Sequence, residues 1–245
     1  MENKSSNIWH FCGISTASVE SFAKLIQPYP HQVISQQLVR REEESVTAFF
    51  FDLDEGISTD IQHQDILYMV QEGLARILTD QTEHQVTPGE CILVPGGCPH
   101  SIEALTALRL MQISVGALPA EEKNKGGSIM EQKDYIKNID KASVKTLAHL
   151  VDYQPDKVAS LTLVQRPLFT TTLMAMDKGC GVGPHICEGD ALVIALDGEG
   201  DVMIGDTHYT VKKEECIVMP AGIPHAVKGE TGQFKMMLIV SKPEA

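Results

Sequence analysis

The sequence predicts an all-β protein of two similar domains, each opening with a short α-helix, and three observations lead to this prediction. The first is an internal repeat. Three residues of the first half recur 125 positions later in the second half: Gly73, Pro95 and His100 return as Gly198, Pro220 and His225. The register holds without a gap from about residue 15 to about residue 104, which chance matches would not do. The second is a series of short β-prone runs. The third is the set of turn residues that separate these runs. Closely spaced strands without intervening helices favour an antiparallel sandwich or barrel.

A short amphipathic pattern at the start of each repeat predicts the helix. Apolar residues stand at helical spacing in both copies: Val19, Phe22, Ala23 and Ile26, then Val144, Leu147, Ala148 and Val151. Ser15 and Asp140 occupy equivalent positions before these runs, and both are good N-caps. Proline then ends each pattern, at Pro28 and Pro30 in the first copy and at Pro155 in the second.

Strand-forming runs follow each predicted helix. In the first copy they cover residues 33–39, 46–53, 66–70, 74–78, 91–94 and 108–115, and each has a counterpart in the second copy. Gly205 and Asp206 separate the run ending at Ile204 from the run that holds Tyr209 and Val211. This spacing predicts a tight hairpin.

The polar, charged stretch from Gly116 to about Asn138 predicts a linker between the two repeats. We therefore expect an N-terminal barrel with its helix at residues 1–116, a linker at 117–139, and a C-terminal barrel with its helix at 140–245. A chain of 245 residues is long enough for two compact domains.

Composition excludes several classes of partner. Hydrophobic residues make up 43% of the chain and charged residues 22%, as in ordinary globular proteins. The net charge of −13, with 20 scattered lysines and arginines, would repel a nucleic-acid backbone. No apolar run approaches the roughly 20 residues that span a bilayer, and no secretory signal is recognisable at the amino terminus. We expect a cytoplasmic protein without nucleic-acid or membrane partners.

The cysteines form no CxxC pair, and we expect reduced thiols at all six positions: Cys12, Cys91, Cys98, Cys180, Cys187 and Cys216. Cys91 and Cys216 fall at equivalent positions inside apolar runs, which predicts small buried side chains. Only Cys187 has neighbours that indicate chemistry.

Two spaced patterns carry a resemblance to a known family. The first has the spacing glycine, five residues, His-x-His, three residues, Glu, six residues, glycine, and its positions hold Gly179, His185, Cys187, Ala191 and Gly198. The second is Pro-x-Gly-x-x-His, present as Pro220, Gly222 and His225, and in the first copy as Pro95, Gly97 and His100. These patterns resemble the two motifs of the cupin superfamily. The resemblance implies a bicupin: two small RmlC-like, cupin-2-type barrels, each a double-stranded β-helix of the jelly-roll type.

The resemblance also implies a candidate metal site in the second barrel, made by His185, Cys187 and His225. Metal-binding members bring three histidines and one carboxylate together at the barrel mouth, a set suited to Zn, Ni, Fe, Mn or Cu. Positions 185, 187 and 191 are separated by even numbers and share one face of an extended strand. Ala191 replaces the glutamate and Cys187 one histidine, so two imidazoles and a thiolate remain for a divalent transition metal. No organic cofactor is implied.

The first copy keeps fewer ligands. Its equivalent positions hold Asp60, Gln62 and Ile66, with His100 from the second motif, so only one imidazole and one carboxylate remain. We expect this barrel to be poor in metal, and we expect His100 to hydrogen bond at the barrel end.

Asp190 is a further candidate, one residue before the empty glutamate position. Its odd spacing from His185 turns it to the opposite face of the strand unless a bulge shifts the register. Asp65 stands at the equivalent position of the first copy, where the other ligands are missing. This favours a structural role shared by both copies, such as hydrogen bonding to a loop, over metal ligation.

Hypotheses from different classes remain open. The first is binding of a small metabolite in the C-terminal barrel, with a divalent transition metal; as an enzyme it would be a metal-dependent dioxygenase, decarboxylase, isomerase or lyase. The alternative is a metal-free protein that binds or senses a small molecule without catalysis. A third is a scaffold or oligomerising role. The resemblance also implies a dimer-like pairing of barrels, either within the chain or between the chains of a homodimer.

Overall fold

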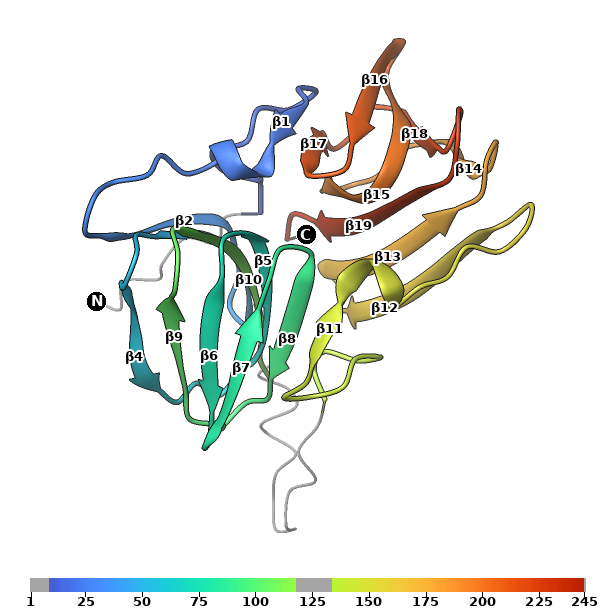
Figure 1. The fold of residues 1–245 in the computed structure, drawn as a ribbon. Coiled ribbons are helices and arrows are strands. Elements are labelled where there is room, and N and C mark those ends of the chain that lie inside the picture. The colour runs from blue at the N-terminus through green and yellow to red at the C-terminus, as the bar shows by residue number, and fades with distance from the viewer. Residues whose placement is uncertain (1–8, 118–133, 245) are drawn as a thin grey trace.

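The computed structural model describes residues 9–117 and 134–244 of the chain. In these residues the protein consists of β-strands and short 3-10 turns, arranged as two barrels (Figure 1). The all-β prediction is confirmed. No helix in the described ranges is long and apolar enough to cross a membrane. Most of the predicted linker, residues 118–133, lies outside the described residues.

Two antiparallel sheets form the first barrel. Its strands are β2 (Val33–Arg40), β3 (Glu44–Phe51), β4 (Gly56–Asp60), β5 (Asp65–Glu72), β6 (Ala75–Thr79), β7 (Thr82–Val86), β8 (Glu90–Val94), β9 (His100–Ala104) and β10 (Leu108–Val115). The larger sheet has the order β11-β8-β5-β10-β3-β2, where β11 (Val144–Thr146) comes from the second repeat. The smaller sheet has the order β4-β9-β6-β7.

The second barrel repeats this plan. Its strands are β12 (Val158–Gln165), β13 (Phe169–Met176), β14 (Gly181–His185), β15 (Asp190–Ile204), β16 (Thr207–Lys212), β17 (Glu215–Met219), β18 (His225–Lys228) and β19 (Phe234–Ser241). The order β1-β17-β15-β19-β13-β12 forms one layer, in which β1 (Glu20–Ser21) comes from the first repeat. The far half of β15 pairs with β16 and β18 in the other layer. The two-residue turn between Ile204 and Thr207 is the predicted hairpin.

The α-helix prediction is wrong for both repeats. In place of each helix the chain forms a short strand and one 3-10 turn: β1 precedes η1 (Phe22–Lys24), and β11 precedes η2 (Leu147–His149). The backbone of each short strand bonds to the other barrel instead of to itself, because β1 pairs with β17 and β11 pairs with β8 (Figure 1). We call residues 9–26 the first lead-in segment and residues 134–151 the second. Each one crosses to the opposite barrel.

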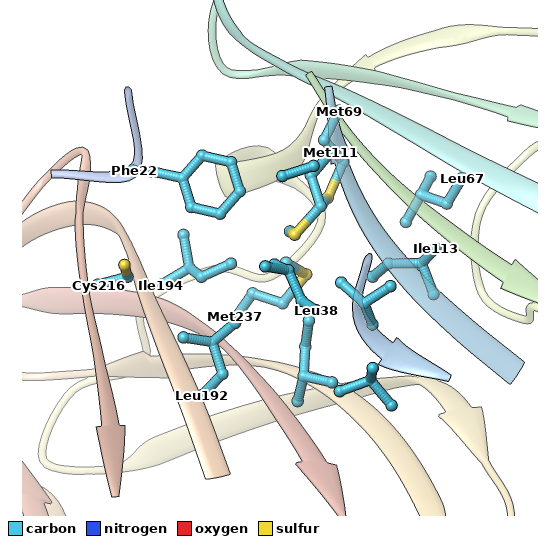
Figure 2. Packing of buried hydrophobic residues seen from close by; sticks show 14 of the residues in the cluster. Phe22, Leu38, Leu67, Met69, Met111, Ile113, Leu192, Ile194, Cys216 and Met237 are labelled. Atoms are coloured by element: carbon cyan, nitrogen blue, oxygen red, sulfur yellow. The ribbon is translucent and has the colours of Figure 1, made fainter. Parts of the chain in front are cut away.

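A shared apolar core joins the barrels. The two larger sheets turn one face toward each other, and the cluster between them contains side chains of both, including Met69 and Met111 from the first barrel and Ile194 and Met237 from the second (Figure 2). Phe22 of the first lead-in segment lies in the same cluster and is 4% exposed. The two barrels of this chain therefore pack against each other through this apolar cluster.

Two arginines at equivalent positions link the barrels reciprocally. Arg41 Nη1 of the first barrel donates to the Lys242 carbonyl of the second at 2.6 Å. Arg166 Nη2 of the second barrel donates to the Gly116 carbonyl at the end of the first at 2.7 Å. Each guanidinium thus donates to a carbonyl just beyond the last strand of the opposite barrel.

Candidate metal centre

The pairing of two short strands places His185 and His225 opposite each other. β14 ends at His185, β18 begins at His225, and these residues are Cα partners in the antiparallel ladder. A register shift interrupts the ladder between Val182 and this pair. The two imidazole rings meet edge to face, with centroids 4.6 Å apart and an angle of 67° between their planes.

Cys187 joins these histidines. Its Sγ and one ring nitrogen of each imidazole all lie within 4.8 Å of one another. Among residues 9–117 and 134–244, this is the only group of three or more His, Cys, Asp or Glu side chains gathered so closely. His185 is exposed, Cys187 is partly buried and His225 is buried, so the group connects solvent with the barrel interior.

Backbone carbonyls orient both imidazoles. His185 Nδ1 lies 3.0 Å from the Gly183 oxygen, and His225 Nδ1 lies 2.9 Å from the Ile223 oxygen. A carbonyl oxygen only accepts, so each Nδ1 carries the hydrogen and each Nε2 keeps its lone pair. Burial lowers the pKa of His225, the bond to Ile223 opposes this, and His185 adds to the lowering. The neutral form, which is the form that binds metals, is therefore favoured.

Two of the cysteines, Cys91 and Cys216, are more deeply buried than Cys187. All six are free thiols. Cys91 and Cys216 are fully buried, as predicted, and burial raises the pKa of each to about 12. Both thiols therefore stay protonated at neutral pH and pack as small apolar side chains.

Asp190 and Ala191 contribute no metal-ligand atom to the group formed by His185, Cys187 and His225. Ala191 packs in the interior cluster of the second barrel, and its methyl group offers no ligand atom. Asp190 Oδ1 accepts a hydrogen bond from the Ala221 N–H at 2.8 Å, and its Oδ2 lies 3.4 Å from His10 Nδ1. The second-barrel candidates thus divide into three residues that converge and one carboxylate that contacts a loop.

In the first barrel the equivalent residues Asp60, Gln62 and His100 all take part in hydrogen bonds within the protein. Asp60 accepts hydrogen bonds from the Ile61 N–H at 2.8 Å and from Gln62 Nε2 at 3.2 Å. His100 has a partner at each ring nitrogen: the Cys98 carbonyl lies 3.1 Å from Nδ1, and the Tyr68 hydroxyl lies 3.0 Å from Nε2. Because Nδ1 donates to a carbonyl, Nε2 accepts from the hydroxyl and is not available to a metal.

Sequence reasoning missed the role of Tyr68. The residue is buried, and burial together with Asp60 raises its pKa, so its hydroxyl remains a donor. A signal was present, since Tyr68 lies two positions after Ile66 and therefore shares its strand face. At the equivalent positions the second barrel has Ala191 and Val193, which are smaller and cannot bond to an imidazole.

Known proteins resemble this chain in sequence and in structure. The family model described as the cupin domain matches residues 172–241. A cupin 2 conserved barrel domain protein from Leptotrichia buccalis is 30% identical, with a TM-score of 0.77, over 95% of this chain and 100% of its own. A search of curated proteins finds no match.

More distant structures share the fold alone. A salicylate 1,2-dioxygenase from Pseudaminobacter salicylatoxidans is 12% identical, with a TM-score of 0.56, over 81% of this chain and 71% of its own. A structure of this enzyme with gentisate is 14% identical, with the same TM-score, over 81% of this chain and 68% of its own.

Proposed function

The chain belongs to the cupin family, and from this premise we propose that its second barrel binds a small metabolite through a divalent transition metal held by His185, Cys187 and His225. The observation that carries the proposal is the convergence of the three donor atoms within 4.8 Å. The bonds from both Nδ1 atoms to backbone carbonyls support it, because they fix the tautomer in which Nε2 is the ligand atom.

The donor set narrows the choice of metal. Imidazole suits Zn, Cu, Fe and Ni, and thiolate favours the softer members of this series, so we propose zinc first. Three protein ligands leave a coordination position for water or for an oxygen of the metabolite, as in catalytic zinc sites. When bound, the metal would supply Lewis acidity to that oxygen. The barrel residues hold the imidazoles in place, and the exposed edge at His185 admits the ligand.

The difference between the barrels supports the second one as the binding site. In the first barrel the Tyr68 hydroxyl hydrogen bonds to His100 Nε2, and Ile66 lies two positions before Tyr68 on the same strand. In the second, Val193 and Ala191 take these positions, so no side chain of the strand bonds to the His225 imidazole. The small side chains leave the donor atoms to a ligand.

One observation favours a second candidate function, binding of a small molecule without metal. Ala191 stands where the family motif has a carboxylate, so the charge that would offset a divalent cation is reduced to the thiolate of Cys187. In this alternative the two imidazoles would bind the metabolite directly by hydrogen bonds.

Zinc titration against a chromophoric chelator tests the proposal. We expect wild-type protein to bind about one zinc ion, and we expect H185A, C187A and H225A each to weaken binding by more than about tenfold. H100A is the matched control, because His100 lies at the equivalent turn and is also buried, but among the described residues it belongs to no close group of three metal-binding side chains. Equal zinc affinity in wild type and H225A would refute the metal site.

A thermal-shift screen separates the two candidate functions. A metabolite that binds the folded state raises the melting temperature by mass action. If zinc mediates binding, the shift caused by a small carboxylic acid disappears after chelation and in H185A. A metabolite that stabilises zinc-free and zinc-loaded protein equally would support metal-free binding instead.

A further inference from the structure

A buried aspartate lies behind the turn that carries His225. Asp190 is 5% exposed, and its Oδ1 accepts a hydrogen bond from the Ala221 N–H at 2.8 Å. Ala221 lies in the turn between β17 and β18, four residues before His225. A hydrogen bond from a backbone N–H to a buried carboxylate is strong and charge-assisted, so it fixes the position of the turn.

The same turn also contacts the third member of the donor group. The Gly222 N–H donates to the Cys187 carbonyl at 2.9 Å. Adjacent residues of one turn are thus tied on one side to Asp190 and on the other to Cys187. A shift of the turn would move His225 relative to Cys187, and the spacing of the donor atoms would change.

The first barrel contains the same hydrogen-bonded turn, but it lacks the group of three metal-binding side chains. Asp65, 1% exposed, accepts from the Gly96 N–H at 3.0 Å, and the Gly97 N–H donates to the Gln62 carbonyl at 2.7 Å. These residues are the equivalents of Asp190, Ala221, Gly222 and Cys187. The turn geometry is therefore common to both barrels, and among the described residues only the second barrel gathers three metal-binding side chains beside it.

The second oxygen of each aspartate reaches the lead-in segment of the other repeat. Asp65 Oδ2 accepts from the backbone N–H groups of Tyr135 and Ile136 at 2.8 and 3.2 Å. At the equivalent place, Asp190 Oδ2 faces the ring of His10, with 3.4 Å between Oδ2 and Nδ1. Each aspartate thus links its turn to the segment that crosses from the opposite repeat.

We propose that Asp190 is a positioning residue for His225 and Cys187, acting through Ala221 and the turn, and that it is not itself a metal ligand. The inference rests on the proposed metal site for its functional meaning. Both oxygens of Asp190 already have partners outside the donor group, and neither belongs to the set of atoms within 4.8 Å of one another.

Cobalt titration followed by visible absorption tests the role of Asp190. D190A removes the acceptor for Ala221 and is expected to weaken cobalt affinity by about 10- to 100-fold, the usual effect of losing an outer-sphere partner, and to alter the d–d spectrum. D190N keeps a carbonyl oxygen as acceptor, so it is expected to restore affinity and spectrum close to wild type. D65A, the matched control in the first barrel, is expected to change neither.

If D190N loses cobalt as fully as D190A, the carboxylate itself binds the metal, and the positioning role is overturned. Wild-type affinity in D190A would overturn it as well. If wild type binds no cobalt, the proposed function fails, and histidine side-chain NMR of the metal-free variants decides the inference: D190A should shift the His225 ring resonances, whereas D190N and D65A should not. Unshifted resonances in D190A would refute positioning.

Discussion

Replacing Phe22 with alanine probes how strongly the two barrels depend on their shared core. Phe22 is 4% exposed and packs among side chains of both barrels, near Met111 of the first and Ile194 of the second (Figure 2). Its N–H also donates to the Glu214 carbonyl of the second barrel at 3.2 Å. Removing the ring leaves a cavity that neither rigid sheet can close.

The expected loss follows from this burial. Truncating a buried phenylalanine to alanine lowers the free energy of unfolding by about 3–5 kcal/mol. At about 2–4 °C per kcal/mol for a chain of this size, the melting temperature should fall by about 6–20 °C. Because the cluster contains residues of both barrels, both should lose stability together.

Urea denaturation followed by circular dichroism measures the effect. Leu53→Ala is the control, since Leu53 is 53% exposed and its truncation should change the free energy of unfolding by less than about 0.5 kcal/mol. A loss below about 1 kcal/mol in Phe22→Ala would refute the reasoning. So would a second transition in which one barrel unfolds at the wild-type urea concentration.

Two further predictions concern turns of the second barrel. Hydrogen bonds from Gln233 and from the Asp156 and Lys178 backbone lower the pKa of Asp177, so its ionised form stabilises the fold above the ordinary pKa of 3.8, and this contribution is lost as the pH falls through the lowered value. Asp177→Asn should therefore be less stable than wild type at pH 7, with a gap in unfolding free energy that closes toward pH 2; a gap independent of pH would contradict this. Gly198→Ala should destabilise the protein far more than Gly179→Ala. Both glycines have positive φ, at 72° and 77°, but a Cβ on Gly198 would lie 2.0 Å from the Gln233 carbonyl, whereas one on Gly179 meets nothing within 4 Å. Equal melting temperatures for the two variants would count against the steric argument.

The residue pattern predicted the barrels and much of the candidate site because both depend on local spacing. Even separation predicted that His185 and Cys187 point the same way; Cys187 lies just beyond the end of β14, and its Sγ lies within 4.8 Å of a ring nitrogen of His185 and of His225. The odd spacing of Asp190 predicted a different direction, and its carboxylate bonds to the Ala221 loop.

The remaining features depend on long-range pairing that spacing does not encode. The apolar residues Phe22 and Ile26 stand at helical spacing, yet they follow a strand that pairs with the opposite barrel, and this pairing decides the local conformation. The bond between Tyr68 and His100 joins strands β5 and β9, and the two residues are 32 positions apart in the sequence. The first case shows a tertiary contact overriding a short pattern, and the second is a contact between two strands that are distant in the sequence.

X-ray absorption of zinc-loaded protein at the zinc edge tests the central claim most directly. Coordination by two imidazoles and one thiolate predicts a sulfur scatterer at about 2.3 Å and nitrogen scatterers at about 2.0–2.1 Å. Cys187→Ser should remove the sulfur shell, and His100→Ala should leave the spectrum unchanged. A spectrum with only nitrogen and oxygen neighbours in wild-type protein would contradict a centre built from His185, Cys187 and His225.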